Sequence, residues 1–257
     1  MCELLGVTAK RKIEMNRRLE EFFRHSVEHR NGWGMVLFDQ SPITVKKEAL
    51  RAIDSRMLAQ IMHHSIKTSG CIAHIRKATI GAEELKNTHP FSKSDRVGRN
   101  WILAHNGTIF ESEELLPYQY LQEGTTDSER ILLYIVDEIN HLCDEKFVEP
   151  TEAERIKTVE QAILSVVPQN KVNLMIYDGD LFFVHKNEEK SLYYTENEDG
   201  VVFSTKPLED EGWKEVPQNR LFVYRDGDLI YAGDPHKHTY VHDEKRMQML
   251  YFDYSGL

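Results

Sequence analysis

Paired cysteines, long apolar runs and an excess of basic residues are all lacking in this sequence. The three cysteines, Cys2, Cys71 and Cys143, lie far apart and form no C-x-x-C pair, so neither a disulfide framework nor a zinc finger is indicated. No apolar run approaches the ~18 residues that a membrane helix needs, and the first residues lack the apolar core of a signal peptide. We therefore expect a cytoplasmic protein, and no cofactor, metal or membrane association is indicated.

The excess of acidic residues argues against nucleic acids and anionic membranes as binding partners. The net charge is -10 and the sequence pI is about 5.7, whereas nucleic-acid and anionic-membrane binding both depend on a basic surface. The 257 residues, 40% hydrophobic and 29% charged, have the composition of a globular protein with a substantial core. A small soluble substrate is therefore expected, and a nucleic acid is not.

Hydrophobic periodicity predicts an alternation of strands and helices in the first part of the chain. The expected elements are a strand over 2–7, a helix over 12–29, a strand over 35–39, a helix over 56–68, and strands over 71–76 and 101–105. The stretch 77–100 has little periodicity, which predicts a long functional loop.

The second part of the chain contains helix caps and hairpin turns. Thr126-x-x-Glu129 and Thr151-x-x-Glu154 predict capping boxes that open helices over 127–143 and from 151. Asp178-Gly179 and Asp226-Gly227 lie between apolar runs and predict β-hairpins. The order of strands, helices and strands again predicts a single α+β domain over 2–257, with two sheets, covering helices and a tail from about residue 234.

Histidines and apolar residues occur in this tail. The spacing of His236, His238 and His242 is compatible with metal ligation, but no cysteine accompanies them, so we expect a solvated tail. The apolar end over 247–254 packs either on the body or on a second subunit, and the sequence leaves both open.

Cys2 stands directly behind the initiator methionine. Removal of Met1 would leave the Cys2 thiol and a free α-amine on the same carbon. A thiol titrates near about 8.5 and an α-amine near about 7.7 to 8.0, so this amine is a base suited to neutral pH. The pattern is that of an N-terminal nucleophile. The alternative is that Cys2 is simply an apolar residue of the opening strand.

Four further clusters contain residues with reactive or substrate-binding side chains. They are His74-Ile75-Arg76-Lys77-Ala78-Thr79 with Gly81, Asn87-Thr88-His89-Pro90-Phe91, His105-Asn106-Gly107, and Thr126-Asp127-Ser128-Glu129. Singly, Arg76 could be an ion-pair partner, Asn106-Gly107 a turn, and Asp127 a first-turn helix residue favoured by the dipole. With Cys2, their order and spacing resemble the glutaminase domain of class II glutamine amidotransferases, which are N-terminal-nucleophile hydrolases with a four-layer αββα fold.

Additional short motifs resemble the stand-alone YafJ-like branch of that family. They are Met1-Cys2-Glu3-Leu4-Leu5-Gly6, Gly32-Trp33-Gly34 before Asp39, Asn100-Trp101, and Thr205-Lys206-Pro207-Leu208. The resemblance runs from residue 2 to about residue 233. It implies a sandwich of two mainly antiparallel sheets covered by helices.

The resemblance also implies a reaction. Cys2 would be the nucleophile and its own α-amine the general base in attack on the side-chain amide of glutamine. The products would be a γ-glutamyl thioester and ammonia, and then glutamate. The side-chain amide of Asn106 and the backbone N–H of Gly107 would bind the oxyanion, where a glycine lets the backbone approach closely.

Substrate-binding residues follow from the same resemblance. Arg76 would clamp the α-carboxylate of glutamine through its planar guanidinium, and Asp127 would bind the α-ammonium. Thr79 and Gly81 would shape the same pocket. Larger members of the family carry a tryptophan after the arginine, which helps to cover the bound glutamine. This sequence has Lys77 there, so it does not decide whether the site closes over its substrate.

The remaining expectations concern three histidines of these clusters and the molecules that the protein binds. His74, His89 and His105 are expected to be structural. The resemblance implies free glutamine or another γ-glutamyl compound as the substrate and a separate synthase chain as acceptor of the ammonia, because fewer residues follow Asp234 than a synthase domain needs. The sequence does not decide whether the protein forms a homodimer. The alternatives are a hydrolase of another γ-glutamyl amide conjugate and a non-catalytic, glutamine-binding regulatory subunit.

Overall fold

The computed structural model describes residues 2–78, 82–208 and 212–254, with side chains up to residue 250. The strands are β1 (Glu3–Glu14), β2 (Trp33–Leu37), β3 (Lys46–Glu48), β4 (Lys67–Ile75), β5 (Phe91–Ser94), β6 (Asn100–His105), β7 (Leu174–Tyr177), β8 (Phe182–Lys186), β9 (Tyr193–Asn197), β10 (Gly200–Ser204), β11 (Lys214–Glu215), β12 (Arg220–Arg225) and β13 (Asp228–Ala232). The α-helices are α1 (Asn16–Arg24), α2 (Arg56–Met62), α3 (Asp127–Lys146), α4 (Glu152–Val166) and α5 (Glu244–Tyr254).

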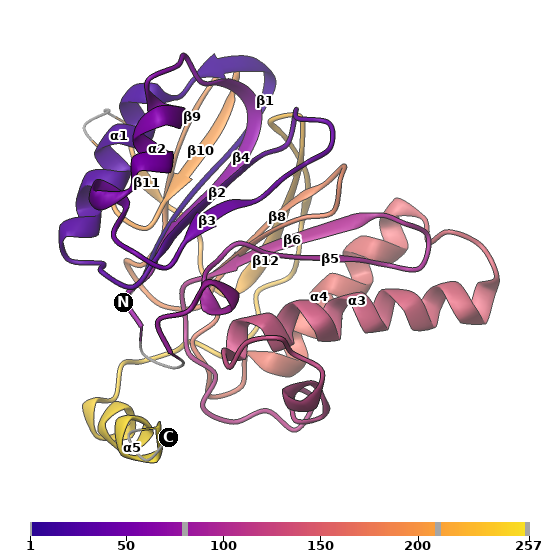
Figure 1. Cartoon of the computed structure of the whole chain (residues 1–257). Coiled ribbons are helices and arrows are strands. Elements are labelled where there is room, and N and C mark those ends of the chain that lie inside the picture. Colours follow the sequence, from indigo (N-terminus) through magenta and orange to yellow (C-terminus); the bar gives the residue numbers. More distant parts are fainter. Residues whose placement is uncertain (1, 79–81, 209–211, 255–257) are drawn as a thin grey trace.

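Two antiparallel sheets lie face to face, and helices cover their outer faces (Figure 1). The first sheet has the order β11-β9-β10-β1-β4-β2-β3, and the second has the order β13-β12-β8-β7-β6-β5. Apolar residues of α1 and α2 pack on the first sheet, and those of α3 and α4 pack on the second. The predicted four-layer αββα sandwich is therefore confirmed.

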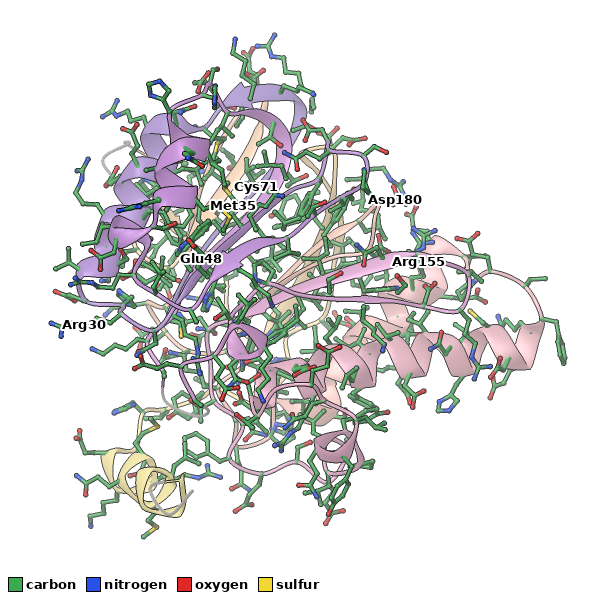
Figure 2. The ribbon with its side chains drawn as sticks, in the orientation of Figure 1. Arg30, Met35, Glu48, Cys71, Arg155 and Asp180 are labelled. Atoms are coloured by element: carbon green, nitrogen blue, oxygen red, sulfur yellow. The ribbon has the colours of Figure 1, made fainter. Side chains whose placement is uncertain are left out.

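Strand alternation supplies the core between the two sheets. Ile72 of β4 and Ile102 of β6 belong to one buried cluster with Met175 and Phe182, so this cluster joins the sheets. The opposite faces of the strands meet the helices, and Met35 and Cys71 are buried there on the first sheet (Figure 2). Full burial of an apolar side chain of this size contributes about 1.5–3 kcal/mol.

Several predicted boundaries in the first half are wrong. The opening strand continues to Glu14, because after an irregularity its pairing with β4 resumes at Ile13 and Thr68. The helix expected from residue 12 therefore begins at Asn16. The predicted helix over 56–68 ends at Met62, and its last residues belong to β4. The expected loop over 77–100 contains β5, which pairs with β6.

Helix caps and hairpins in the second half follow the sequence more closely. Thr151 and Glu154 form the reciprocal capping box of α4. Thr126 caps α3 through its hydroxyl, but the Glu129 carboxylate accepts hydrogen bonds from the N–H groups of Glu123 and Gly124, so the predicted second box is not reciprocal. The hairpins β7–β8 and β12–β13 are confirmed.

The tail is partly packed rather than wholly solvated, which corrects the expectation for it. The Nε2 atom of His236 lies 3.0 Å from Nε2 of His185, and Tyr240 is buried. Beyond it, α5 lies at the edge of the molecule (Figure 1), and its Arg246 donates from Nη1 to the carbonyl of Gln169 at 2.8 Å. Within the described ranges, no helix combines the length and the apolar character needed to cross a membrane.

Candidate active site

Strand register brings Cys2 next to Arg76. Glu3 of β1 pairs with Ile75 of β4 in an antiparallel ladder, so Cys2, just before β1, and Arg76, just after β4, lie at adjoining ends of the two strands. The Sγ atom of Cys2 lies 3.4 Å from both the backbone N and the carbonyl oxygen of Lys77. The first sheet thus places a thiol beside a guanidinium.

The second sheet supplies the Asn106-Gly107 turn at the end of β6. The backbone N–H of Asn106 donates to the carbonyl of Asn173, and its side-chain Nδ2 lies 3.4 Å from the Thr205 hydroxyl oxygen. A Cβ atom on Gly107 would lie 2.0 Å from the carbonyl oxygen of Lys171 and 2.2 Å from the His105 ring. Glycine is therefore required here by the packing of the turn itself, and not only by close approach of a substrate.

Cys2, Arg76, Gly107 and Asp127 line one cavity, which we call the Arg76 cavity. Its other walls include His89 and His105. The cavity is narrow, with a volume of about 30 Å³, so we expect its walls to separate when a ligand of amino-acid size enters. The predicted residues Thr79 and Gly81 lie outside the described residues.

Polar contacts hold the two charged groups of the Arg76 cavity in place. The Arg76 side chain is buried and donates from Nη1 to the carbonyl of Ala82 at 2.9 Å. Asp127 accepts from the N–H of Ile109 at 2.7 Å and from the Ser128 hydroxyl at 3.2 Å. A guanidinium and a carboxylate on one cavity can bind the carboxylate and ammonium of an amino acid.

Burial raises the pKa of the Cys2 thiol, and this effect exceeds the lowering by the Lys77 N–H and by the Arg76 charge. At neutral pH the thiol is therefore the prevailing form. A base must remove its proton for the sulfur to become nucleophilic, because the thiolate and not the thiol attacks.

The three histidines near the site are packed and neutral. Burial lowers the pKa of His105, whose Nε2–H donates to the carbonyl of Lys171. The His74 and His89 rings pack with their centroids 4.2 Å apart and their planes tilted by 32°, and burial holds both pKa values well below the usual range. Within the described residues their ring nitrogens have no hydrogen-bond partner. That the three histidines are structural stays a prediction.

Asn106 lies on a different cavity, which Cys2 also lines; we call it the Asn106 cavity. Its walls include Lys171 and Thr205, neither of which the sequence singled out as a site residue. Thr205 occurred only in a branch-specific motif, and no local signal marks Lys171. In the described part of the chain, no group of three His, Cys, Asp or Glu side chains could hold a metal ion.

A family comparison agrees with this geometry. The sequence model described as "Glutamine amidotransferases class-II" matches residues 1–196. The chain belongs to this family. The resemblance seen in the sequence is therefore confirmed.

Similar proteins occur in several microorganisms. An uncharacterised protein of Methanocaldococcus jannaschii is 28% identical over 260 residues, which cover 91% of this chain and 72% of that protein. YafJ of Escherichia coli, which carries the provisional name of a glutamine amidotransferase, is 29% identical over 142 residues, 54% of this chain and 55% of YafJ. The γ-glutamyl-hercynylcysteine sulfoxide hydrolase of Mycolicibacterium smegmatis is 23% identical over 209 residues, covering 80% of this chain and 83% of that enzyme.

Solved structures share the fold. The crystal structure of a predicted glutamine amidotransferase from Pseudomonas aeruginosa superposes with a TM-score of 0.63 at 22% sequence identity. The match covers 90% of this chain and 100% of that chain. The sandwich architecture of glutamine amidotransferases is thus common to both.

Proposed function

We propose that this family member is a glutaminase, which hydrolyses the side-chain amide of glutamine to glutamate and ammonia through a Cys2 γ-glutamyl thioester. The observation that supports it best is the shared lining of the Arg76 cavity by Cys2, Arg76 and Asp127. In this proposal Arg76 binds the α-carboxylate of the substrate and Asp127 its α-ammonium. A free amino acid is then positioned with its side chain toward the sulfur.

The proposed chemistry starts after removal of Met1. The α-amine of Cys2 takes the thiol proton as the sulfur adds to the amide carbon, and it then gives this proton to the departing nitrogen. The C–N bond breaks and ammonia leaves. Water, activated by the same amine, hydrolyses the thioester to glutamate and restores the thiol.

The oxyanion of each tetrahedral intermediate needs two hydrogen-bond donors. We assign them to the Asn106 side-chain amide and the Gly107 N–H. The Gly107 N–H has no hydrogen-bond partner within the described part of the chain, so it is available to a ligand. Thr205, 3.4 Å from Asn106 Nδ2, would orient the amide.

A second candidate keeps the chemistry and changes the leaving group. The Mycolicibacterium smegmatis relative is named as a hydrolase of a γ-glutamyl compound larger than glutamine. The extent of the Asn106 cavity favours such a substrate for this chain as well. For the glutaminase reaction, transfer of ammonia to a separate synthase chain stays a prediction.

The Cys2→Ala substitution tests the proposal directly. With Met1 removed, the parent protein should release glutamate and ammonia from glutamine in equal amounts, whereas Cys2→Ala should release neither. Removing the triad nucleophile of a serine protease lowers kcat by about 10⁶, which sets the expected scale.

Cys143→Ala is the matched control, because Cys143 lies in α3 and lines neither cavity. It should keep the parent rate. Equal glutamate release by the parent and Cys2→Ala would instead support a non-catalytic, glutamine-binding protein.

A further inference from the structure

Cys2 separates two cavities of very different size. The Arg76 cavity has a volume of about 30 Å³, whereas the Asn106 cavity has a volume of about 340 Å³. Neither Arg76 nor Asp127 lines the larger cavity. The sulfur therefore has the amino-acid anchors on one side and a larger space on the other.

Ammonia alone does not require this space. A molecule of water, which is similar in size to ammonia, needs only about 10–15 Å³ by such a measure. A volume of about 340 Å³ lies instead in the range of small-molecule sites. When a glutamyl group is anchored at Arg76 and Asp127 with its γ-carbon at Cys2, a substituent on the amide nitrogen extends past the sulfur toward Asn106.

Two buried charged side chains, Lys171 and Glu3, line the Asn106 cavity, and each has a partner. Lys171 is buried and its Nζ lies 2.5 Å from the Glu188 carboxylate. Glu3 is also buried, and its carboxylate lies 2.6 Å from Lys206 and 2.7 Å from His25. A buried charge without a partner is strongly destabilising, so the ion pairs of Lys171 and Glu3 hold these side chains in fixed positions and make this part of the lining polar.

The mouth of the cavity carries two charges of opposite sign that are not paired. Lys77 and Glu28 both line the cavity and are exposed, and neither side chain has an ion-pair partner in the described parts of the molecule. A group with one carboxylate and one ammonium would complement both charges. An apolar group or a group of one sign would leave at least one of them uncompensated.

We propose that the Asn106 cavity is a leaving-group subsite for N-substituted γ-glutamyl amides whose departing amine carries both a carboxylate and an ammonium group. This inference rests on the thioester chemistry proposed above. The sulfur adds to the amide carbon, the C–N bond breaks, and the thiol proton passes through the α-amine to the departing nitrogen. Water then cleaves the thioester, so each turnover converts one amide and one water into glutamate and a free amine.

The test compares three substrates with the full chain after Met1 removal. They are glutamine, γ-glutamylmethylamide and Nε-(γ-glutamyl)lysine. Glutamine releases ammonia, the methylamide releases methylamine, and the lysine conjugate releases lysine, which carries both a carboxylate and an α-ammonium group. Glutamate release should give a kcat/KM for the lysine conjugate at least about tenfold above the other two, a difference equivalent to about 1.4 kcal/mol. Equal or higher kcat/KM for glutamine or the methylamide would overturn the subsite and leave the glutaminase proposal standing. Release from none of the three would overturn both.

Substitutions that remove the charge of Lys77 or of Glu28 test whether these two residues cause the preference for the lysine conjugate. Lys77→Gln and Glu28→Gln should each lower the ratio of kcat/KM for the lysine conjugate to that for glutamine by about three- to fivefold, the scale of a partly exposed charge pair. Lys214→Gln, at a surface ion pair with Glu196 outside both cavities, is the matched control and should leave the ratio unchanged. An unchanged ratio in both mouth variants would overturn the assignment of the zwitterionic amine.

Discussion

Asn106 and Gly107 are adjacent residues with different constraints. The Asn106 side chain is buried and its Nδ2 points to within 3.4 Å of Thr205, while the Gly107 position is set by backbone packing. A side chain that serves the oxyanion is expected to matter for turnover more than for folding. A turn glycine without room for a Cβ is expected to matter for both.

Asn106→Ala should lower kcat for glutamine by about 10²–10³ with little change in KM, because an oxyanion donor acts mainly in the transition state. Steady-state rates of glutamate release measure both constants. Thermal unfolding of the same sample shows whether the fold persists. A parent-like kcat would assign the oxyanion to other donors.

Gly107→Ala should lower both stability and activity. The added Cβ would lie 2.0 Å from the Lys171 carbonyl oxygen, so the turn must shift. Overpacking of this kind costs about 1–3 kcal/mol of the free energy of unfolding, which denaturant unfolding can measure. Unfolding at the parent midpoint together with full activity would contradict the assigned geometry of the turn.

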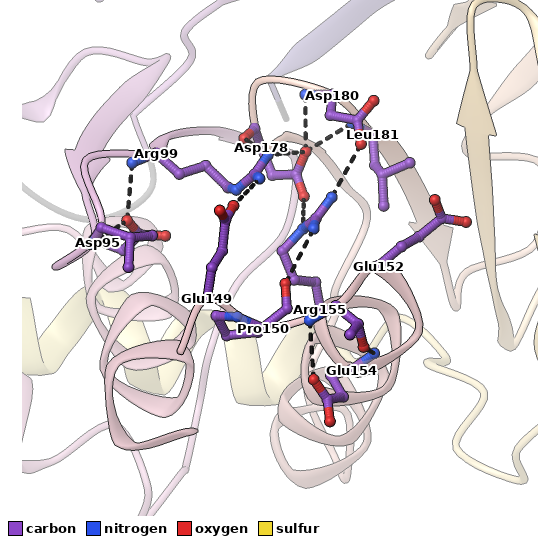
Figure 3. A network of polar contacts seen from close by, with 12 residues as sticks. Asp95, Arg99, Glu149, Pro150, Glu152, Glu154, Arg155, Asp178, Asp180 and Leu181 are labelled. Carbon is purple, nitrogen blue, oxygen red and sulfur yellow. Dashed lines mark hydrogen bonds and ion pairs between the residues drawn. The ribbon is translucent and has the colours of Figure 1, made fainter. Parts of the chain in front are cut away.

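At the scale of elements, α4 is joined to the β7–β8 turn by buried charges (Figure 3). Arg155 of α4 donates from Nε to Asp178 at 2.8 Å and from Nη2 to Asp180 at 3.0 Å. Asp178 is fully buried and also accepts from the N–H groups of Asp180 and Leu181, so one carboxylate both shapes the hairpin turn and receives the helix.

Arg155→Ala should lower the free energy of unfolding by about 3 kcal/mol, because the buried Asp178 carboxylate would lose the guanidinium that donates to it and keep only the more distant Arg99, at 3.9 Å. Chemical denaturation measures the change. Lys214→Ala is the control, since it removes an ion pair that is more than half exposed on both sides and should leave the unfolding midpoint nearly unchanged. Similar losses in the two variants would show that burial of Asp178 is unimportant.

The elements that the sequence predicted well have local signals, and the others depend on distant partners. The Thr151–Glu154 cap and the two Asp-Gly hairpins are specified within a few residues, and each is present. The second half of β1 is not, because it depends on distant partners: Lys10 donates its N–H to the carbonyl of Asp199, and Ile13 and Glu14 pair with β4 more than fifty residues away. β5 likewise forms only through pairing with β6.

At the scale of the whole molecule, the candidate site exists only when the two sheets stack. Cys2 directly precedes β1 and Arg76 directly follows β4, both strands of the first sheet. Gly107 lies just after β6 of the second sheet, and Asp127 opens α3, which packs on that sheet. Motif spacing could identify these residues because each motif is short. It could not predict the Asn106 cavity, whose walls combine residues 3, 171, 188 and 206 from separate parts of the chain.

Activity should also depend on how the mature chain begins. In the proposed mechanism the base is the α-amine on the carbon that bears the Cys2 side chain, and a preceding residue converts this amine into an amide that cannot take a proton at neutral pH. A chain that retains Met1 should therefore be inactive.

Insertion of one glycine between Met1 and Cys2 tests this, because removal of Met1 then leaves glycine at the terminus and the cysteine acylated. We expect glutamate release to fall by at least about 10², the lower end of what general base catalysis contributes. Intact mass should confirm each terminus and thermal unfolding the common fold. Parent-like turnover with the added glycine would require another base for the Cys2 thiol.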